Sequence, residues 1–298
     1  MNLHSSSMLN PQNCFINCYL CRSTEFVARK GEVRDNPSLQ IRECLNCGLV
    51  ALTDNSHIVS DFYENSGMHG SEIIAIDEWL KQSECDDLRR FEMLRKVLPN
   101  KKLLDFGCGA GGFLSLASSL VETATGIELE DRVIKYWQGK LNIVQNIDDA
   151  GGGEYDLVTA FHVIEHLSDP LAILQSLAKK LCPSGRIVIE VPSSEDALLT
   201  LYACEAFQHF TYWSQHLFLF NANTLEMLSR KAGLKVVAIQ HVQRYPLSNH
   251  LHWLSKGKPG GHKYWGFLDS PEMTNAYANT LASLGKTDTL IAYLELCN

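Results

Sequence analysis

The sequence predicts an α/β fold in which helices cover both faces of a mostly parallel sheet. From residue 101 onward, short apolar segments alternate with segments of helical periodicity, and this alternation is typical of parallel sheets. A second feature precedes that domain: two Cys-x-x-Cys pairs lie within residues 18–47. The cysteine pairs predict a small N-terminal module joined to the α/β domain.

Apolar runs and turn residues place the elements along the chain. Strands are expected at 103–106, 124–128, 141–144, 155–163, 186–191, 234–242 and 289–296, the fifth preceded by a Pro-Ser-Gly turn at 183–185. Helices are expected at 111–120, 131–137, 170–181 and 224–232, with a further amphipathic helix inside 71–98. Two aromatic- and histidine-rich insertions, 193–221 and 243–287, interrupt the alternation near the carboxyl ends of strands, where open α/β sheets bind ligands.

Composition and charge exclude several classes of protein. The 298 residues carry a formal net charge of −8, which argues against nucleic acid as the main partner. The sequence contains no run of 18 apolar residues, so no membrane-spanning helix is predicted. The polar start lacks the apolar core of a signal peptide, and a cytoplasmic location is therefore the expectation. The predicted organisation is a disordered tail (1–13), a cysteine module (14–60), a helical connector (61–99) and the α/β domain (100–298).

The segment Asp105-Phe106-Gly107-Cys108-Gly109-Ala110-Gly111-Gly112 follows a predicted strand and opens a helix. Glycines there permit positive φ and close approach of a ligand to the backbone. Glu128 ends the next strand, where a carboxylate can accept hydrogen bonds from a ribose diol. The charge of Asp105 would support the loop and an amino group of the cofactor. The glycines and Glu128 fit S-adenosylmethionine and NAD alike, whereas Asp105 favours S-adenosylmethionine. A tight turn without a ligand is the structural alternative.

The cysteine pairs predict a metal site. Cys18 and Cys21 form one pair, and Cys44 and Cys47 form the other. Two such pairs at this separation suit a tetrahedral structural zinc ion with four thiolate ligands. Metal ligands are favoured over disulfides because a reducing compartment disfavours disulfides. The alternative to a metal site is four unrelated buried thiols. Cys14 is a spare cysteine whose spacing fits the site less well.

The glycine loop together with Phe161-His162-Val163-Ile164-Glu165-His166 resembles the class I S-adenosylmethionine-dependent methyltransferases, especially those of sugar and surface-polysaccharide pathways. The resemblance implies a Rossmann-like, mostly parallel sheet with an antiparallel last strand. It also implies eight residues that bind S-adenosylmethionine: Asp105, Gly107, Gly109, Glu128, Asn146, Ile147, Phe161 and His162. Glu128 would bind the ribose, and Phe161 and His162 would lie beside the methionine or the sulfonium. Glu165 and His166 either bind a metal or proton, or organise the turn before Pro170, and we favour the turn.

Some sugar methyltransferases of this kind carry an N-terminal zinc-ribbon module and a histidine followed by leucine after the fifth strand. By this resemblance His216 is the candidate base, and Tyr212 is a weaker catalytic candidate. Alternatively, His216 only packs before Leu217 and Phe218. The expected reaction is methyl transfer to a hydroxyl or carbon of a small acceptor, a nucleotide-linked sugar or surface glycan, bound by the two insertions.

Three other functions compete with this one. An NAD-dependent oxidoreductase with structural zinc fits the glycine loop, and an RNA methyltransferase could bind its substrate through the zinc module. The third is a zinc-ribbon interaction module on a degenerate cofactor fold. The net charge of −8 weighs against RNA, and the intact glycine loop with Glu128 weighs against a degenerate fold.

Overall fold

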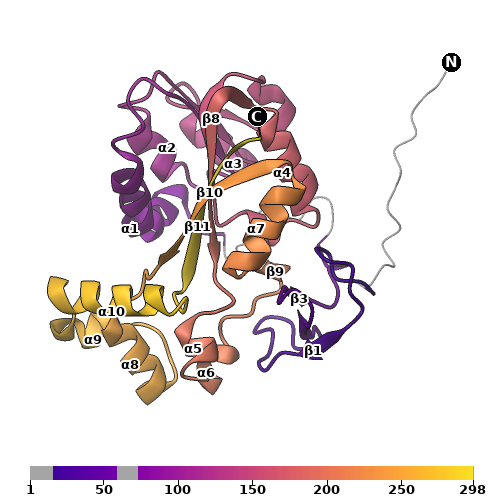
Figure 1. Ribbon diagram of the computed structural model, residues 1–298. Coiled ribbons are helices and arrows are strands. Elements are labelled where there is room, and N and C mark those ends of the chain that lie inside the picture. Colours follow the sequence, from indigo (N-terminus) through magenta and orange to yellow (C-terminus); the bar gives the residue numbers. More distant parts are fainter. Residues whose placement is uncertain (1–15, 59–72, 298) are drawn as a thin grey trace.

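The larger part of the chain forms a seven-stranded sheet in the strand order β10-β11-β8-β7-β4-β5-β6. Figure 1 shows β10, β11 and β8 of this sheet side by side. The computed structural model describes residues 16–58 and 73–297. The predicted tail (1–13), Cys14 and residues 61–72 of the predicted connector lie outside the described residues. β11 is antiparallel to both of its neighbours, and the pairs among β8, β7, β4, β5 and β6 are parallel. The expected sheet with an antiparallel last strand is therefore confirmed.

The strands begin and end close to the predicted positions. They are β4 (Lys102–Phe106), β5 (Thr123–Ile127), β6 (Asn142–Val144), β7 (Tyr155–Phe161), β8 (Leu181–Pro192), β10 (Leu234–Val242) and β11 (Thr289–Leu296). The prediction of a turn at 183–185 before a strand at 186 is wrong, because β8 already starts at Leu181. The pairing register between β7 and β8 shifts after Tyr155, and this irregularity accommodates Pro183 and Gly185 within the strand.

Helices cover both faces of this sheet, as Figure 1 shows. Around the sheet lie α1 (Ile76–Leu94), α2 (Gly112–Ala117), α3 (Asp131–Trp137), α4 (Pro170–Ala178) and α7 (Ala222–Lys231). Neighbouring strand residues point to opposite faces: Leu103 belongs to one buried cluster with Leu94 and Phe113, and Leu104 belongs to another with Leu174. Both faces of the sheet are thus buried, as expected for parallel strands.

The N-terminal module is a small antiparallel sheet that the second half of the chain completes. Its order is β1 (Phe26–Ala28), β2 (Ile41–Cys44), β3 (Val50–Leu52) and β9 (Phe218–Leu219). β9 comes from the insertion at 193–221, and Val50 pairs with Leu219. Module residues also share one apolar cluster with the main sheet. The boundary expected near residue 60 therefore does not separate two independent packing units.

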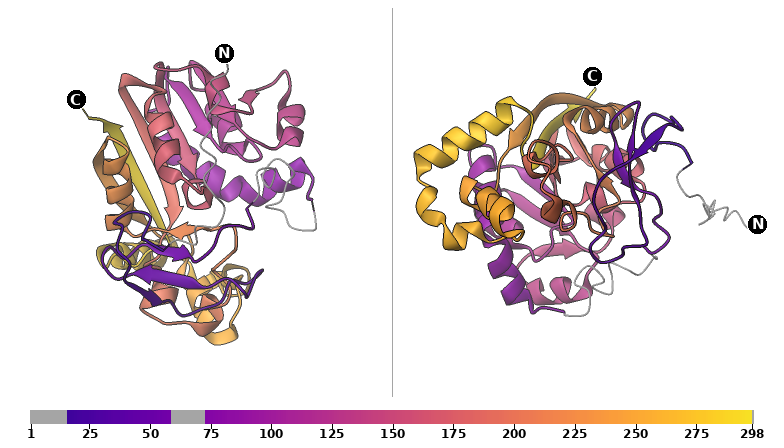
Figure 2. Two further views of the ribbon diagram at one scale, coloured as in Figure 1. Left: turned by 90° about the vertical axis from the view of Figure 1, so that its right-hand side faces the viewer. Right: turned by 90° about the horizontal axis from the view of Figure 1, so that it is seen from below.

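The two insertions fold mainly into helices at one end of the sheet (Figure 2). They contain α5 (Ala197–Thr200), α6 (Glu205–Gln208), α8 (Leu247–Lys256), α9 (Gly261–Tyr264) and α10 (Pro271–Ser283). Short 3-10 turns occur at η2 (Ile147–Ala150), η3 (Ile164–His166) and η4 (Gly266–Leu268). The module and α8–α10 lie at the end where β8 and β10 terminate. Within the described ranges, no helix is long and apolar enough to cross a membrane.

Candidate active site

The glycine loop lies across the end of β5. The amides of Gly107 and Cys108 both donate to the carbonyl of Ile127, at 2.9 and 3.0 Å. Gly107 has a φ of +67°, and a Cβ atom there would lie 2.5 Å from Cγ2 of Val163. Only glycine satisfies both the backbone conformation and this close contact.

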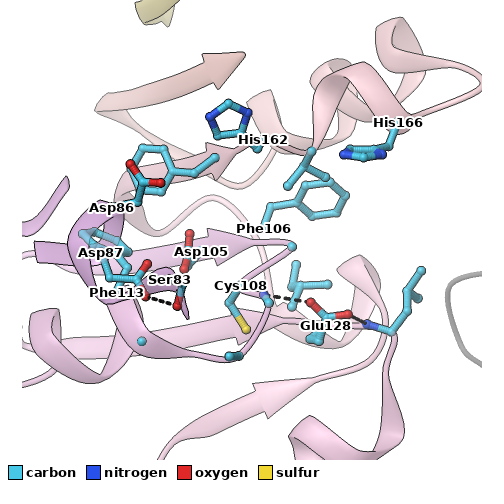
Figure 3. Close-up of a pocket in the computed structure, with 18 of the residues that line it drawn as sticks. Ser83, Asp86, Asp87, Asp105, Phe106, Cys108, Phe113, Glu128, His162 and His166 are labelled. Atoms are coloured by element: carbon cyan, nitrogen blue, oxygen red, sulfur yellow. Dashed lines mark hydrogen bonds between the residues drawn. The ribbon is translucent and has the colours of Figure 1, made fainter. Parts of the chain in front are cut away.

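Glu128 is fixed by backbone amides on both sides of its carboxylate (Figure 3). Its Oε2 accepts from Gly109 N at 2.9 Å, and its Oε1 accepts from Leu129 N at 2.8 Å and Glu130 N at 3.1 Å. Burial raises the pKa of Glu128 in spite of these bonds. A carboxylate has about four acceptor positions, so the orientation that can receive a ribose hydroxyl is set in advance.

Asp105 lies buried at the carboxyl end of β4 and accepts a hydrogen bond from Thr159 Oγ1 at 2.6 Å. Burial raises the pKa of Asp105 to about 7. A cationic ligand beside it would stabilise the ionised carboxylate. Binding of such a ligand and proton loss at Asp105 are therefore coupled.

One cavity of about 610 Å³ collects all the residues expected to bind the cofactor. Its size is typical of a site for a small organic ligand. The lining includes Asp105, Gly107, Gly109, Glu128, Asn146, Ile147, Phe161 and His162. The sequence-based assignment of these eight residues is thus spatially consistent.

Helix α1, which was predicted to be part of a connector, forms a further wall of this cavity. Trp79, Ser83, Asp86, Asp87 and Arg90 all line the cavity, and Ser83 Oγ donates to Asp87 at 2.7 Å. The polar members are spaced three or four positions apart, which places them on one helix face. That spacing within an amphipathic helix was the signal that could have identified them.

Glu190 anchors α1 to the sheet through a buried ion cluster. Arg89 and Arg90 approach its Oε1 at 2.7 and 2.9 Å, and His162 Nε2 lies 3.1 Å from the same oxygen. Burial alone would raise the pKa of Glu190, but His162 and the arginines outweigh it and lower that pKa. His162, in turn, has a φ of +54° and lies 3.1 Å from Glu165 through Nδ1. These partners fix the histidine ring at the cavity wall.

Arg244, at the end of β10, extends this cluster to the second insertion. Its Nε donates to Asp86 Oδ1 at 3.0 Å, and its Nη1 lies 3.1 Å from His162 Nε2. Asp288 accepts from the backbone amide of Arg244. The role of Arg244 could not be predicted from the sequence, because these partners are more than 40 positions away.

A second cavity of about 670 Å³ adjoins the first at the carboxyl end of the sheet. Residues of the N-terminal module and of both insertions line it, among them Arg34, Phe210, Trp253 and Lys263. Four residues line both cavities: His162, Trp213, His216 and Arg244. The two cavities therefore meet at a shared wall.

His216 is one of the four residues at this shared wall. Its ring lies 4.7 Å from that of His166 and 5.8 Å from that of Trp213, measured between centroids. Burial and the neighbouring His166 lower the pKa of His216 to about 3, so the ring is neutral near pH 7. A carboxylate oxygen of Glu165 and a ring nitrogen of His216 lie within 4.8 Å of each other.

Tyr212 does not reach either cavity. Its side chain is 1% exposed, and its hydroxyl accepts a hydrogen bond from Arg29 Nε at 3.0 Å. It is absent from the lining of both cavities. This geometry gives no support to the catalytic role predicted for Tyr212, and it places the tyrosine in the packing between module and insertion.

The four predicted cysteine ligands converge. Cys18 Sγ lies 3.6 Å from Cys47 Sγ, and Cys21 Sγ lies 3.4 Å from Cys44 Sγ. All four sulfur atoms lie within 4.8 Å of one another, and none forms a disulfide. Zinc–sulfur bonds of about 2.3 Å in a tetrahedron separate the sulfurs by about 3.8 Å. The donor set and spacing therefore fit a zinc ion.

The parallel sheet, the glycine loop and the partly buried Glu128 carboxylate at the end of β5 are typical of Rossmann-like enzymes that bind an adenosine cofactor. The family of this enzyme follows from a match over residues 77–239 to the family model described as "Methyltransferase domain". The chain belongs to that family and is an S-adenosylmethionine-dependent methyltransferase. The match decides between S-adenosylmethionine and NAD in favour of the former.

Known relatives cover the cofactor-binding part of the chain. A ubiquinone biosynthesis O-methyltransferase of Thiobacillus denitrificans is 26% identical over 181 residues, covering 55% of this chain and 78% of the relative. One from Vibrio parahaemolyticus is 31% identical over 117 residues, covering 35% and 50%. In a solved complex of the Haloferax volcanii Trm112 methyltransferase activator with a methyltransferase, one chain aligns with a TM-score of 0.51 at 14% identity, covering 75% of this chain and 96% of that one. This likeness supports the fold alone.

Proposed function

We propose that this enzyme transfers the methyl group of S-adenosylmethionine to a hydroxyl group of a small acceptor bound in the second cavity. The observation that carries the proposal is the wall shared by both cavities, made of His162, Trp213, His216 and Arg244. Methyl transfer requires the acceptor atom to meet the sulfonium methyl in line and at close range. Two adjoining cavities of this size satisfy that requirement.

The curated relatives support a hydroxyl as the acceptor, because they are named as O-methyltransferases. Aromatic side chains in the second cavity, including Phe207, Phe210 and Trp253, favour an acceptor that contains a ring. Phenols have this property, and so do the nucleotide-linked sugars and glycans that the sequence analysis predicted. The sugar acceptor therefore stays one specific hypothesis within the broader proposal.

His216 is the proposed general base. S-Adenosylmethionine supplies an electrophilic methyl whose bond to sulfur breaks, with its electrons, as the acceptor oxygen attacks. The neutral ring of His216 takes the hydroxyl proton during that attack. Glu165 is fully buried, and its Oε2 has no hydrogen-bond partner among the described residues. Its negative charge would stabilise the imidazolium formed at His216.

The variant His216→Ala tests this role. Loss of a positioned base should lower kcat by about 10²- to 10⁴-fold, whereas the dissociation constant for S-adenosylhomocysteine should change less than twofold. Leu201→Ala, at an exposed position in the first insertion, serves as the matched control. Unchanged kcat in His216→Ala would remove the histidine from the mechanism.

The acceptor class is tested by mass spectrometry with methyl-labelled S-adenosylmethionine. Phenols, nucleotide sugars, glycans and RNA are offered in parallel, and the expected product carries the label on oxygen of a small molecule. Label only on RNA, or only on carbon, would contradict the proposal.

We further propose that Cys18, Cys21, Cys44 and Cys47 bind one structural zinc ion. The convergence of four unbridged thiols supports it, since four thiolates complete the coordination shell and leave no position for substrate. The ion would connect the loop after residue 18 to β2 and so stabilise the module against which the first insertion packs.

A further inference from the structure

We propose that the acceptor carries an anionic group, a phosphate or a carboxylate, and that Arg34 and Lys263 bind this group in the second cavity. The inference rests on the proposed function, because it assigns the second cavity to the acceptor. Arg34 belongs to the N-terminal module and Lys263 belongs to α9, and both line the cavity. The N-terminal module would therefore take part in substrate recognition as well as in folding.

Arg34 is held in place by aromatic rings, and its guanidinium forms no ion pair with a carboxylate of the described residues. Burial lowers the pKa of Arg34, and the nearby charge of Asp35 only partly offsets this effect. The guanidinium carbon of Arg34 lies 4.9 Å from the ring centre of Phe210 and 4.7 Å from that of Trp213. Its Nη1 donates a long hydrogen bond of 3.5 Å to the Phe210 carbonyl. The adjacent Asp35 is engaged by Ser214, through the amide at 2.9 Å and the hydroxyl at 2.7 Å. Rings on its faces leave the N–H edge of a guanidinium available to an anion.

The loop that carries Arg34 is fixed to the first insertion by its backbone. The amide of Arg34 donates to the Tyr212 carbonyl at 3.0 Å, and that of Glu32 donates to the Gln208 carbonyl at 3.3 Å. The backbone of Tyr212 thus supports the position of Arg34. A guanidinium placed in advance loses less entropy when it binds a ligand.

The other charged groups of the cavity do not neutralise Arg34 and Lys263. Arg244 is balanced by Asp86, and Asp288 accepts hydrogen bonds from the backbone amides of residues 244 and 245. Burial and the nearby Asp288 raise the pKa of Asp196 to about 8, so that this carboxyl is mostly protonated at pH 7. Within residues 16–58 and 73–297, neither Arg34 nor Lys263 forms an ion pair with a carboxylate.

Trp213 connects this anion site to the place of methyl transfer. The same indole lies against Arg34 and forms part of the wall shared with the cofactor cavity. An acceptor whose anionic group contacts Arg34 would therefore extend toward His216. We infer that Arg34 sets both the charge preference for the acceptor and the distance between its anionic group and the reacting hydroxyl.

Calorimetry on the full chain saturated with S-adenosylhomocysteine tests the inference, because the occupied first cavity cannot bind the probe. The probes are inorganic pyrophosphate and malonate, which distinguish a phosphate from a carboxylate preference. Arg34→Gln and Lys263→Gln should each bind the preferred probe at least about tenfold more weakly, since each removes a charge-assisted contact. Arg230→Gln, on the exposed face of α7, should bind it as the wild type does.

Two results would overturn the inference: no binding of either probe by the wild-type protein, or equal binding by wild type and Arg34→Gln. Neither result depends on methyl transfer, which is measured separately through His216→Ala and product analysis. Loss of S-adenosylhomocysteine binding in Arg34→Gln would indicate misfolding, and Arg34→Lys then serves as the test variant. Arg34→Lys should bind the preferred anionic probe more weakly than the wild type does, and equal binding would contradict the inference.

Discussion

The two cavities of this enzyme are built in different ways. The cofactor cavity is made largely by one continuous stretch, from the glycine loop to His166, with α1 added from the residues just before it. The acceptor cavity combines Arg34 of the module, Trp213 of the first insertion and Lys263 of the second. The first therefore depends on local chain geometry, whereas the second depends on contacts between distant segments. Single substitutions should therefore impair ligand binding in one cavity and leave binding in the other unchanged.

The largest difference between the effects on the two cavities is expected from a substitution in the zinc site. The wild type is expected to contain about one zinc per chain. Cys44→Ser should lose this metal and disorder the module, because zinc binding contributes several kcal/mol or more to small metal-bound folds. Acceptor methylation should then be lost while S-adenosylhomocysteine still binds. Metal analysis and calorimetry measure both quantities, and Cys297→Ser, at an exposed position outside the cluster, is the control. A stable, active and zinc-free wild type would refute the assignment.

Glu128→Ala should have the opposite selectivity. The variant removes a charged group that accepts hydrogen bonds from the ribose hydroxyls, at about 1.5–3 kcal/mol per bond, so S-adenosylhomocysteine binding should weaken about 100-fold. Anion binding in the second cavity is expected to persist. Calorimetry gives the dissociation constants, with the exposed Glu122→Ala as the matched control. Affinity equal to wild type would mean that Glu128 does not contact the ribose.

A smaller effect should come from Asp105 and should be confined to the cofactor cavity. Its raised pKa, about 7 in the free enzyme, means that the carboxyl is protonated below pH 7. A cationic cofactor selects the ionised form, so its affinity should fall by up to about tenfold per pH unit below 7 and level off above 7. Binding titrations with S-adenosylmethionine between pH 5.5 and 8.5 measure this pH dependence of the affinity. Asp105→Asn should flatten it, and an unchanged slope in that variant would assign the proton to another group.

Tyr212→Phe should have the smallest effect on catalysis. Losing the bond from Arg29 should lower the free energy of unfolding by about 1 kcal/mol, and kcat should stay within about twofold of wild type. Denaturant unfolding and steady-state kinetics provide the comparison. A hundredfold loss of kcat with normal stability would restore the predicted catalytic role.

The difference between the cavities also explains what the sequence could predict. The sheet and the lining of the first cavity could be predicted from short motifs, because Gly107 and Glu128 lie only 21 positions apart in the sequence. Arg244 and Arg34 were missed because their partners, Asp86 and Trp213, lie more than 150 positions away. The burial of Tyr212 against Arg29 could not be predicted for the same reason, since it depends on the module packing onto the insertion.

The central claim, that methyl transfer occurs at the wall shared by the two cavities, is tested most directly by a crystal structure with S-adenosylhomocysteine. The sulfur atom should lie in the first cavity, within roughly 8 Å of the His216 ring, which leaves room for a methyl group and an acceptor oxygen. It should face the opening between Trp213 and Arg244. A sulfur atom that points away from this wall, with no open path to the second cavity, would contradict the claim.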